Sequence, residues 1–440
     1  MDERIEELLD GVRRTGVSFL NLQFTDVSGA IKTVSLPAGR LRGALEDGVW
    51  FDGSAVEGAA RVVESDLYLR PDPSTFVLLP WESQPTARLI CDLCLPDGAP
   101  FPADPRNALR AVLAEAAELG FDYRVSSELE FFVFEDGDSA TACPTLKPVD
   151  RSGYFEVPDD RAERLCFSTV LALSSVGFQV ETTHHEVVAG QQEIDVAELG
   201  ALEAADAIVT LKSGLKAFAS RDHLLISFMP KPIEGVSGSG LHLQQRLVDP
   251  RDGSNLFQDP GNRYHLSDLG RWFVAGQLAH ARGLCAVVAP LVNSYKRLLG
   301  GAEAPSRISW ARVNRGSLIR IPELRLKTGT RVEFRASDPA CNPYLALAVM
   351  LEAGLDGIQN KSSLPAPVEQ LDGLEDREER VDPLPETLEE ALEELDWDPV
   401  VRAALGQPIY ERFLAVKARE WLAYRRHISS WELETYLRRA

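Results

Sequence analysis

Hydrophobic and polar positions alternate along parts of the chain as strands require, and they recur with a helical period in others. Residues 1–15 and 105–120 predict amphipathic helices, because apolar positions return every three or four residues. Residues 17–37 predict two strands joined by a tight turn. Mixed elements continue to about residue 360, and residues 410–440 are helical again. This mixture predicts an α+β fold.

A stretch rich in proline, glycine and aspartate, PDGAPFPADP, interrupts this pattern at residues 96–105. Asp104–Pro105 is a typical helix start. We therefore expect two domains, residues 1–103 and 104–440. A Pro-rich acidic segment at residues 365–396 predicts a solvated surface loop that runs into a charged helix.

The stretch RVSSELEFFVFE at residues 124–135 has the pattern of a buried strand, but it carries two acidic residues. Side chains on a strand alternate between faces, so Glu128, Glu130 and Phe132 share one face. Neighbouring carboxylates repel each other and resist burial. The strand therefore predicts a bound cation.

Three further stretches supply groups of the same chemistry. They are VETTHHEVVAGQQEIDV, with Glu181, Glu186 and Glu193 beside His184 and His185; GSGLHLQQRL, with His242; and TRVEFR, where Glu333 lies between Arg331 and Arg335. Each stretch alone is weak evidence for a metal site, because a lone carboxylate is usually a surface residue and a lone histidine is usually structural. Together they form a glutamate-rich set that suits hard divalent cations such as Mg²⁺ or Mn²⁺.

Basic residues gather in one segment of this acidic chain. Between residues 293 and 322 they are Lys296, Arg297, Arg307, Arg312, Arg315 and Arg320. Arginine binds carboxylates and phosphates with two parallel N–H groups. Divalent metals and arginines around one pocket suit phosphoryl transfer, in which negative charge spreads over oxygens. No GxxxxGK[ST] phosphate-binding motif occurs, so a nucleotide is held in another way.

Composition narrows the choice of partners. The chain has 440 residues, a net charge of −21 and a pI of about 4.9, which argues against nucleic acid or an anionic membrane. The first residues, MDERIEELLD, do not resemble a signal peptide, and we expect a cytoplasmic protein. Cys91 and Cys94 form a lone CxxC, for which buried structural cysteines are favoured over a zinc or redox site.

Ten stretches together carry a family resemblance. They include FDGSAVEGAARVVESDLYLRPD, PWESQPTARLICDLCLPDGAPFPADPR, ELEFFVFE, HHEVVAGQQEID, VNSYKRLLGGAEAP, NRGSLIRIP and RVEFRASDPACNPYLALA. In this order they are highly specific, and over nearly its full length the chain resembles type I glutamine synthetase.

The resemblance implies a small β-grasp-like N-terminal domain followed by a large catalytic domain, a curved antiparallel sheet with flanking helices. It implies a homo-oligomer, a dodecamer of two hexameric rings with active sites between subunits. It also implies a ligase reaction: ATP phosphorylates the γ-carboxylate of glutamate, and ammonia then displaces phosphate to give glutamine.

The resemblance also assigns roles to residues. Glu130, Glu186 and Glu193 correspond to the ligands of one metal ion, Mg²⁺ or Mn²⁺. Glu128, His242 and Glu333 correspond to the ligands of a second. The family's residues that bind glutamate and the amine correspond to Tyr154, Gly238, Arg297 and Arg335. Its ATP-binding residues correspond to Glu181, Arg315, Arg320 and Arg331. The family's catalytic residues correspond to Asp52, Glu303 and Arg315. Asp52 would come from a neighbouring subunit and deprotonate ammonium. Arg61 matches a regulatory position.

Some positions depart from the family pattern, and they leave the acceptor open. Ser237 replaces the Asn of the NGSG turn, and Ala55 replaces the second Ser of DGSS. Ammonia is the favoured acceptor, while the alternative is a γ-glutamyl-amine ligase for a polyamine, ethanolamine or methylamine. A non-catalytic relative is disfavoured, because all six metal-ligand positions are kept.

Overall fold

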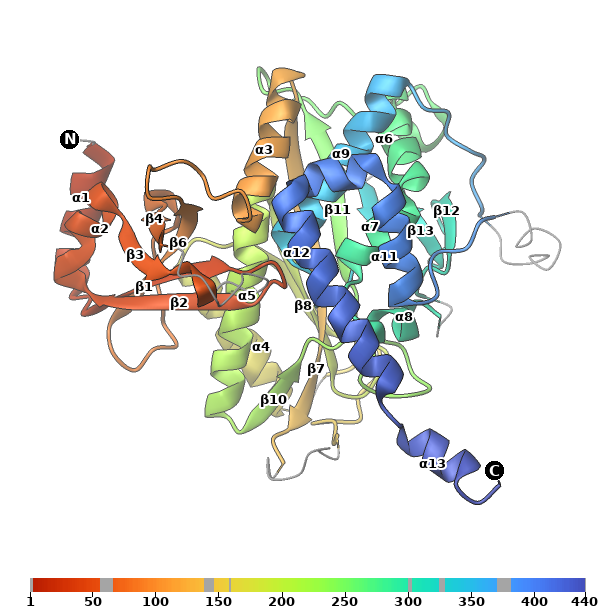
Figure 1. Ribbon diagram of the computed structural model, residues 1–440, viewed down its shortest axis with the longest axis horizontal. Coiled ribbons are helices and arrows are strands. Elements are labelled where there is room, and N and C mark those ends of the chain that lie inside the picture. The colour runs from red at the N-terminus through yellow and green to blue at the C-terminus, as the bar shows by residue number, and fades with distance from the viewer. Residues whose placement is uncertain are drawn as a thin grey trace.

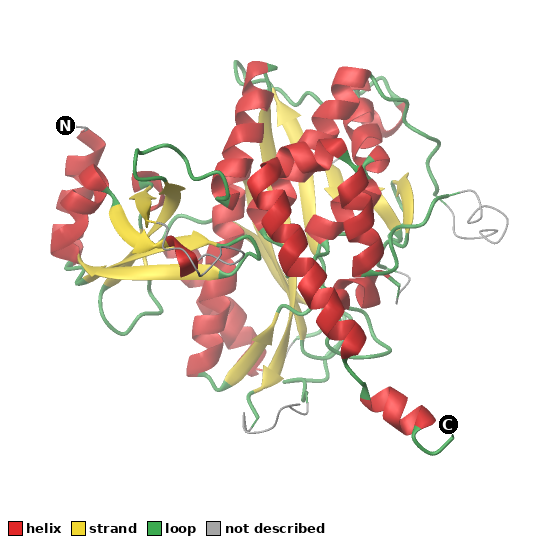
Figure 2. Cartoon of the chain, viewed as in Figure 1, coloured by secondary structure: helices red, strands yellow, loops and turns green. Residues whose placement is uncertain are grey.

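The computed structural model describes residues 3–55, 66–137, 146–157, 160–299, 303–323, 329–369 and 381–439. Strands gather into two sheets, and most helices pack around the larger one (Figures 1 and 2), so the expected α+β class is confirmed. Within the described part of the chain, no helix has the length and hydrophobicity needed to cross a bilayer.

The N-terminal part builds a six-stranded sheet in the order β2-β1-β6-β4-β3, with β5 paired to β6. Its strands are β1 (Phe19–Thr25), β2 (Ile31–Pro37), β3 (Val49–Asp52), β4 (Asp66–Pro71), β5 (Val77–Leu78) and β6 (Thr86–Cys94). The helices here are α1 (Glu3–Thr15), α2 (Leu41–Asp47) and the short 3₁₀ turns η1 (Ala38–Arg40), η2 (Gly53–Ala55) and η3 (Pro73–Thr75). The predicted first helix and strand pair are confirmed, and Cys91 and Cys94 are buried without a disulfide.

The second sheet has eight strands in the order β12-β13-β14-β11-β7-β9-β8, with β10 paired to β7. They are β7 (Asp122–Glu135), β8 (Val180–His185), β9 (Gln191–Gly200), β10 (Leu224–Ser227), β11 (Leu241–Val248), β12 (Arg307–Ala311), β13 (Ser317–Arg320) and β14 (Val332–Phe334). Its pairs are antiparallel except β12 with β13, which run parallel.

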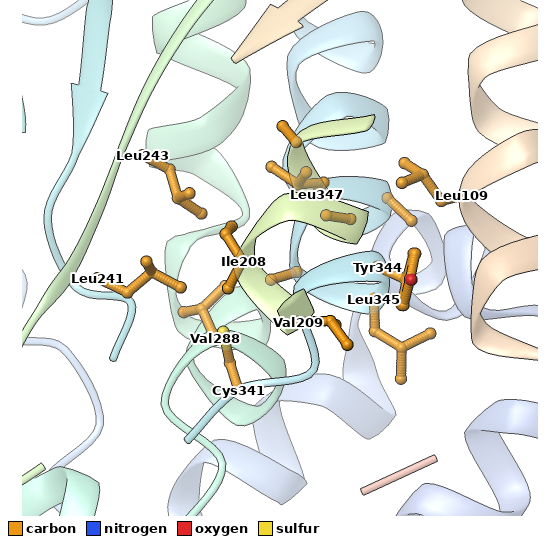
Figure 3. Packing of buried hydrophobic residues seen from close by; sticks show 14 of the residues in the cluster. Leu109, Ile208, Val209, Leu241, Leu243, Val288, Cys341, Tyr344, Leu345 and Leu347 are labelled. Carbon is orange, nitrogen blue, oxygen red and sulfur yellow. The ribbon is translucent and has the colours of Figure 1, made fainter. Parts of the chain in front are cut away.

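Helices of this part pack mainly on one face of the sheet, and the last of them projects away from it (Figure 1). They are α3 (Pro105–Glu118), α4 (Asp160–Ser175), α5 (Ala201–Arg221), α6 (Asp268–Ala279), α7 (Ala281–Val288), α8 (Val292–Leu298), α9 (Pro343–Asn360), α11 (Leu388–Trp397), α12 (Pro399–Arg426) and α13 (Ser430–Tyr436), with the turn η4 (Arg263–His265). Asp104 caps the predicted helix α3 by accepting from the backbone N–H of Arg106. Helix α9 is apolar nearly all round and lies in the core, where Leu345 and Leu347 belong to the same buried cluster as Ile208 and Val209 of α5 (Figure 3).

The two faces of the large sheet differ in chemistry, and this difference places the site. On β7, Val125, Leu129 and Phe131 are fully buried in the core cluster. Glu128 and Glu130 alternate with them and therefore point to the opposite face. The same alternation on β9, β11 and β14 puts acidic groups and a histidine on that polar face.

A buried ion network joins the N-terminal sheet to the rest of the chain. The Arg106 side chain is 3% exposed and contacts Asp72 at 2.9 Å, Asp92 at 2.6 Å and Asp206 of α5 at 2.9 Å. Tyr344 of α9 donates a 2.6 Å hydrogen bond to Asp206. The network connects β6 and the β4–η3 turn to α3, α5 and α9.

Candidate active site

Strand register sets the acidic residues of the polar face in rows. His242 of β11 is paired with Glu128 of β7, and Glu130 of β7 is paired with Glu193 of β9. Glu333 of β14 lies one strand beyond β11 and is paired there with Gln244. Residues far apart in sequence therefore meet because the strands are adjacent, and not because of any local motif.

The first acidic cluster contains Glu128, His242 and Glu333. His242 Nδ1 lies 3.3 Å from an oxygen of Glu128 and 3.8 Å from one of Glu333. One ligand atom from each residue lies within 4.8 Å of the other two, a spacing that fits a single metal ion. The structure thus brings together the three residues expected to share one metal.

The second cluster differs in part from the expected set of Glu130, Glu186 and Glu193. The atoms that lie within 4.8 Å of one another belong to His184, Glu193 and Asp195. His184 also lies between carboxylates, 3.6 Å from Glu186 and 3.5 Å from Glu193. Asp195 was missed by the sequence analysis, although its spacing of two from Glu193 on a strand places both on one face.

Electrostatics show an excess of negative charge in this face. Burial, together with the charge of Glu186, raises the pKa of Glu130 to about 8, although Arg297 opposes the shift. Burial and the charges of Glu130 and Asp195 also raise the pKa of Glu193. Burial and Arg335 lower the pKa of His242 well below its usual value, so the imidazole is neutral and has a lone pair to donate. Crowded buried carboxylates around a neutral imidazole fit divalent cations.

The central pocket has a volume of about 150 Å³ and lies between the clusters and the basic residues. Its lining residues are Glu128, Glu130, Tyr154, His184, Glu186, Gln191, Glu193, Lys231, Ser237, Gly238, His242, Arg297, Glu303, Ala304, Arg315, Arg320, Glu333 and Arg335. Expected metal, amino-acid and phosphate residues therefore share one cavity.

An adjoining pocket of about 610 Å³ shares Glu128, His184 and Arg320 with the central pocket. Glu181 and Arg331, two of the residues expected to bind ATP, also line it. Arg315, expected in the same role, lines the central pocket instead. The adjoining pocket offers the larger space, which suits the base and ribose of a nucleotide.

Two arginines of the central pocket, Arg297 and Arg335, are held by backbone carbonyl groups. Arg297 is 4% exposed and donates to the carbonyl oxygens of Arg335, Ala336 and Ser337 at 3.0–3.2 Å. Arg335 donates to the carbonyl oxygens of Arg315 and Glu303 at 3.0 and 3.2 Å. Arg335 thereby joins the two loops whose side chains, Glu303 and Arg315, lie 3.6 Å apart at the pocket mouth.

Two glycines allow the backbone to approach these side chains. A Cβ on Gly238 would lie 2.1 Å from the carbonyl oxygen of Pro230, so only glycine fits there. A Cβ on Gly240 would lie 2.6 Å from Arg297, and the Gly240 N–H donates to Glu130 at 2.9 Å. Gly240, Gln191 and Lys231 were not predicted as site residues, because their part depends on contacts between distant segments.

Two predicted residues lie away from the pocket or outside the described chain. Asp52 ends β3, the edge strand of the N-terminal sheet, and lines neither pocket. Hydrogen bonds from the backbone N–H and hydroxyl of Ser54 lower its pKa. Arg61 lies outside the described residues.

Comparisons with known proteins match both parts of the chain to one family. Residues 102–436 match the family model for the glutamine synthetase catalytic domain, and residues 16–96 match the glutamine synthetase β-grasp domain. The predicted β-grasp-like start is thereby confirmed, while the boundary at residue 103 stays a prediction.

Individual relatives extend over the whole chain. A glutamine synthetase of Thermus thermophilus is 46% identical over 442 residues, and one of Clostridium saccharobutylicum is 44% identical over 439 residues, each covering 98% of both chains. A solved structure titled GmaS/ADP complex superposes with a TM-score of 0.88 at 30% identity, covering 98% of this chain and 99% of that one. The chain belongs to the glutamine synthetase family.

Proposed function

We propose that this enzyme is a glutamate–ammonia ligase that uses ATP to convert L-glutamate and ammonium into glutamine. The observation that carries the proposal is the polar sheet face, where two carboxylate clusters and four arginines share one pocket. Relatives named glutamine synthetase are 44–46% identical and each covers 98% of this chain, which favours ammonia as the acceptor.

The metal roles follow from the donor chemistry. Glu128, His242 and Glu333 would hold one divalent cation, and Glu130, Glu186 and Glu193 a second, with His184 and Asp195 beside it. Bound Mg²⁺ or Mn²⁺ supplies positive charge that offsets the phosphates of ATP and the carboxylate of glutamate.

The protein side chains supply orientation and proton transfer. Arg297 and Arg335 are rigidly held and would orient glutamate beside Gly238. Arg315 and Arg320 would stabilise charge on the transferred phosphoryl group, while Glu181 and Arg331 hold the nucleotide in the adjoining pocket. Ammonium becomes a nucleophile only after it loses a proton, a step we assign to the carboxylate of Asp52. Tyr154 and Glu186 would form the walls of the space for this small cation, and Glu303 would close the mouth of the central pocket.

Assembly completes the site in this proposal. Asp52 lies on the edge strand β3 and lines neither the central nor the adjoining pocket of its own chain, so it would serve the pocket of a neighbouring copy. Helix α13 projects from the body of the molecule (Figure 1), with Trp431 61% and Leu437 73% exposed. Exposed apolar surface of this kind suits an interface between the two rings of a dodecamer in the cytoplasm.

The deciding experiment measures ATP-dependent phosphate release with glutamate and a panel of acceptors: ammonium, methylamine, ethanolamine and a polyamine. We expect release with ammonium and formation of glutamine, with both Mg²⁺ and Mn²⁺ tested. If the enzyme couples glutamate to a larger amine and forms no glutamine at high ammonium, that amine is the acceptor and the assignment of ammonia is wrong. Light scattering of the full chain measures the number of subunits.

A further inference from the structure

A buried histidine–aspartate pair lies directly behind the central pocket. His185 ends β8, and its Nε2 lies 3.0 Å from Oδ1 of Asp150. The two side chains are 0% and 3% exposed. The same oxygen of Asp150 accepts a 2.8 Å hydrogen bond from the backbone N–H of Gly190. One carboxylate oxygen therefore contacts both ends of the turn between β8 and β9.

This turn carries Glu186 into the pocket. The Glu186 N–H donates to the carbonyl oxygen of Gln191 at 2.9 Å, and His185 Nδ1 lies 2.6 Å from the carbonyl oxygen of Glu186. Gly190 has φ of +74°, and a Cβ there would lie 2.8 Å from a β7 carbonyl oxygen, so the turn sits tightly on the sheet. Next to it, Gln191 donates to Glu130 at 3.1 Å.

The segment after Asp150 forms another wall of the same pocket. Tyr154 lines the pocket, and its ring lies 4.0 Å from that of Phe155. The Phe155 N–H donates to the carbonyl oxygen of His185 at 3.1 Å. The phenylalanine ring also packs edge-on against His184, with 4.8 Å between centroids. The pair thus connects the backbone that carries Tyr154 to the turn that carries Glu186.

We propose that Asp150, acting through His185 and Gly190, is a positioning residue that holds Glu186 and Tyr154 at the separation needed to bind ammonium. Asp150 does not line the pocket, so it acts through its neighbours. The inference rests on the proposed function, since it names ammonium as the cation that these walls enclose.

The chain offers a matched control for the test. Asp398 also pairs with a histidine, 2.8 Å from Nδ1 of His280, whose side chain is 15% exposed, and it accepts the backbone N–H groups of Val400 and Val401 at 3.0 and 3.1 Å. It lines neither pocket. Asp150→Ala and Asp398→Ala therefore each remove an aspartate–histidine contact and its backbone hydrogen bonding, the first beside the site and the second remote from it. His280 keeps a second partner, Asp356, at 3.2 Å.

The assay compares the KM values for ammonium, glutamate and ATP in the wild type and both variants. We expect Asp150→Ala to raise the KM for ammonium about ten- to hundredfold, as the loss of one hydrogen bond to a charged group does, with the KM for ATP unchanged within about twofold. Asp398→Ala should leave all three within about twofold while lowering the melting temperature comparably. Asp150→Asn keeps an acceptor for Gly190 and should restore most of the ammonium affinity.

A second measurement does not depend on activity. Calorimetric titration with Mn²⁺ should show weaker binding to metal-free Asp150→Ala than to Asp398→Ala, because Glu186 is displaced. The proposal is overturned if Asp150→Ala raises the KM for ammonium no more than Asp398→Ala does, or raises all three KM values alike. If the wild type forms no glutamine, the proposed function fails on its own. Unchanged Mn²⁺ binding by Asp150→Ala would then overturn the positioning role.

Discussion

Glu130 and Glu193 face each other across the β7–β9 pair, and burial raises the pKa of both carboxyl groups. Two buried carboxylates next to each other destabilise the metal-free protein, because their charges repel and are poorly solvated. A bound divalent cation would neutralise this charge. We therefore expect Glu193→Gln to leave the melting temperature of the metal-free protein equal or higher, while glutamine synthesis is lost. Mn²⁺ at about 100 times its dissociation constant stabilises a protein by about 2.7 kcal/mol, and the variant should lose much of that gain.

Differential scanning fluorimetry with and without Mn²⁺ measures this effect. Glu198→Gln is the matched control, because Glu198 lies on the same strand, β9, but lines neither pocket and pairs with Arg246 at 2.5 Å. The control should keep the full Mn²⁺-dependent rise in melting temperature. An equal rise in Glu193→Gln and in the control would contradict the metal assignment.

Replacing Arg106, the centre of the buried ion network, should be costly to stability. Arg106→Met leaves Asp206 without its guanidinium, while Arg110 still lies 3.0 Å from Asp72. Removing one partner of a buried pair costs about 3–5 kcal/mol, because the remaining charge stays desolvated. The urea midpoint, measured at a fixed protein concentration, should fall accordingly.

The comparison variant for this experiment is Arg251→Met. Arg251 pairs with Asp249, but its side chain is 86% exposed, so solvent screens the pair and the change should lower the urea midpoint far less than Arg106→Met does. Equal midpoints for the two variants would show that the Arg106 network does not connect the N-terminal sheet to the helices energetically.

The sequence anticipates the site where local pattern decides it. Alternation on β7 predicts that Glu128 and Glu130 share a face, and the structure has them on the polar side. It does not predict that Asp195 joins His184, or that Arg297 is fixed by three carbonyl oxygens, because both depend on strand register and loop packing. Asp150 is not predicted from the sequence for the same reason, because its partners lie 35 and 40 residues away along the chain.

The stability of the protein should depend on pH through His280. Burial lowers the pKa of this histidine, but hydrogen bonds and charge from Asp398 and Asp356 outweigh burial, so its pKa lies above the usual 6.5. A histidine with a raised pKa stabilises the fold fully below its unfolded pKa, and the contribution is lost as pH rises through the folded pKa. The melting-temperature cost of His280→Asn should therefore be larger at about pH 6 than at about pH 9. A cost that grows with pH would contradict this account of the pair.

Subunit complementation provides a direct test of the place of Asp52. Asp52→Ala and Glu193→Gln should each be inactive, since one lacks the proposed base and the other a proposed metal ligand. If Asp52 acts on the neighbouring copy, a mixed oligomer contains pockets in which an intact Glu193 cluster meets an intact Asp52. Random assembly of equal amounts into rings should then restore about a quarter of wild-type activity. Activity is measured after the two variants are unfolded and refolded together, with each refolded alone as the control. If Asp52 instead served its own pocket, every pocket would lack one group and the mixture would stay inactive.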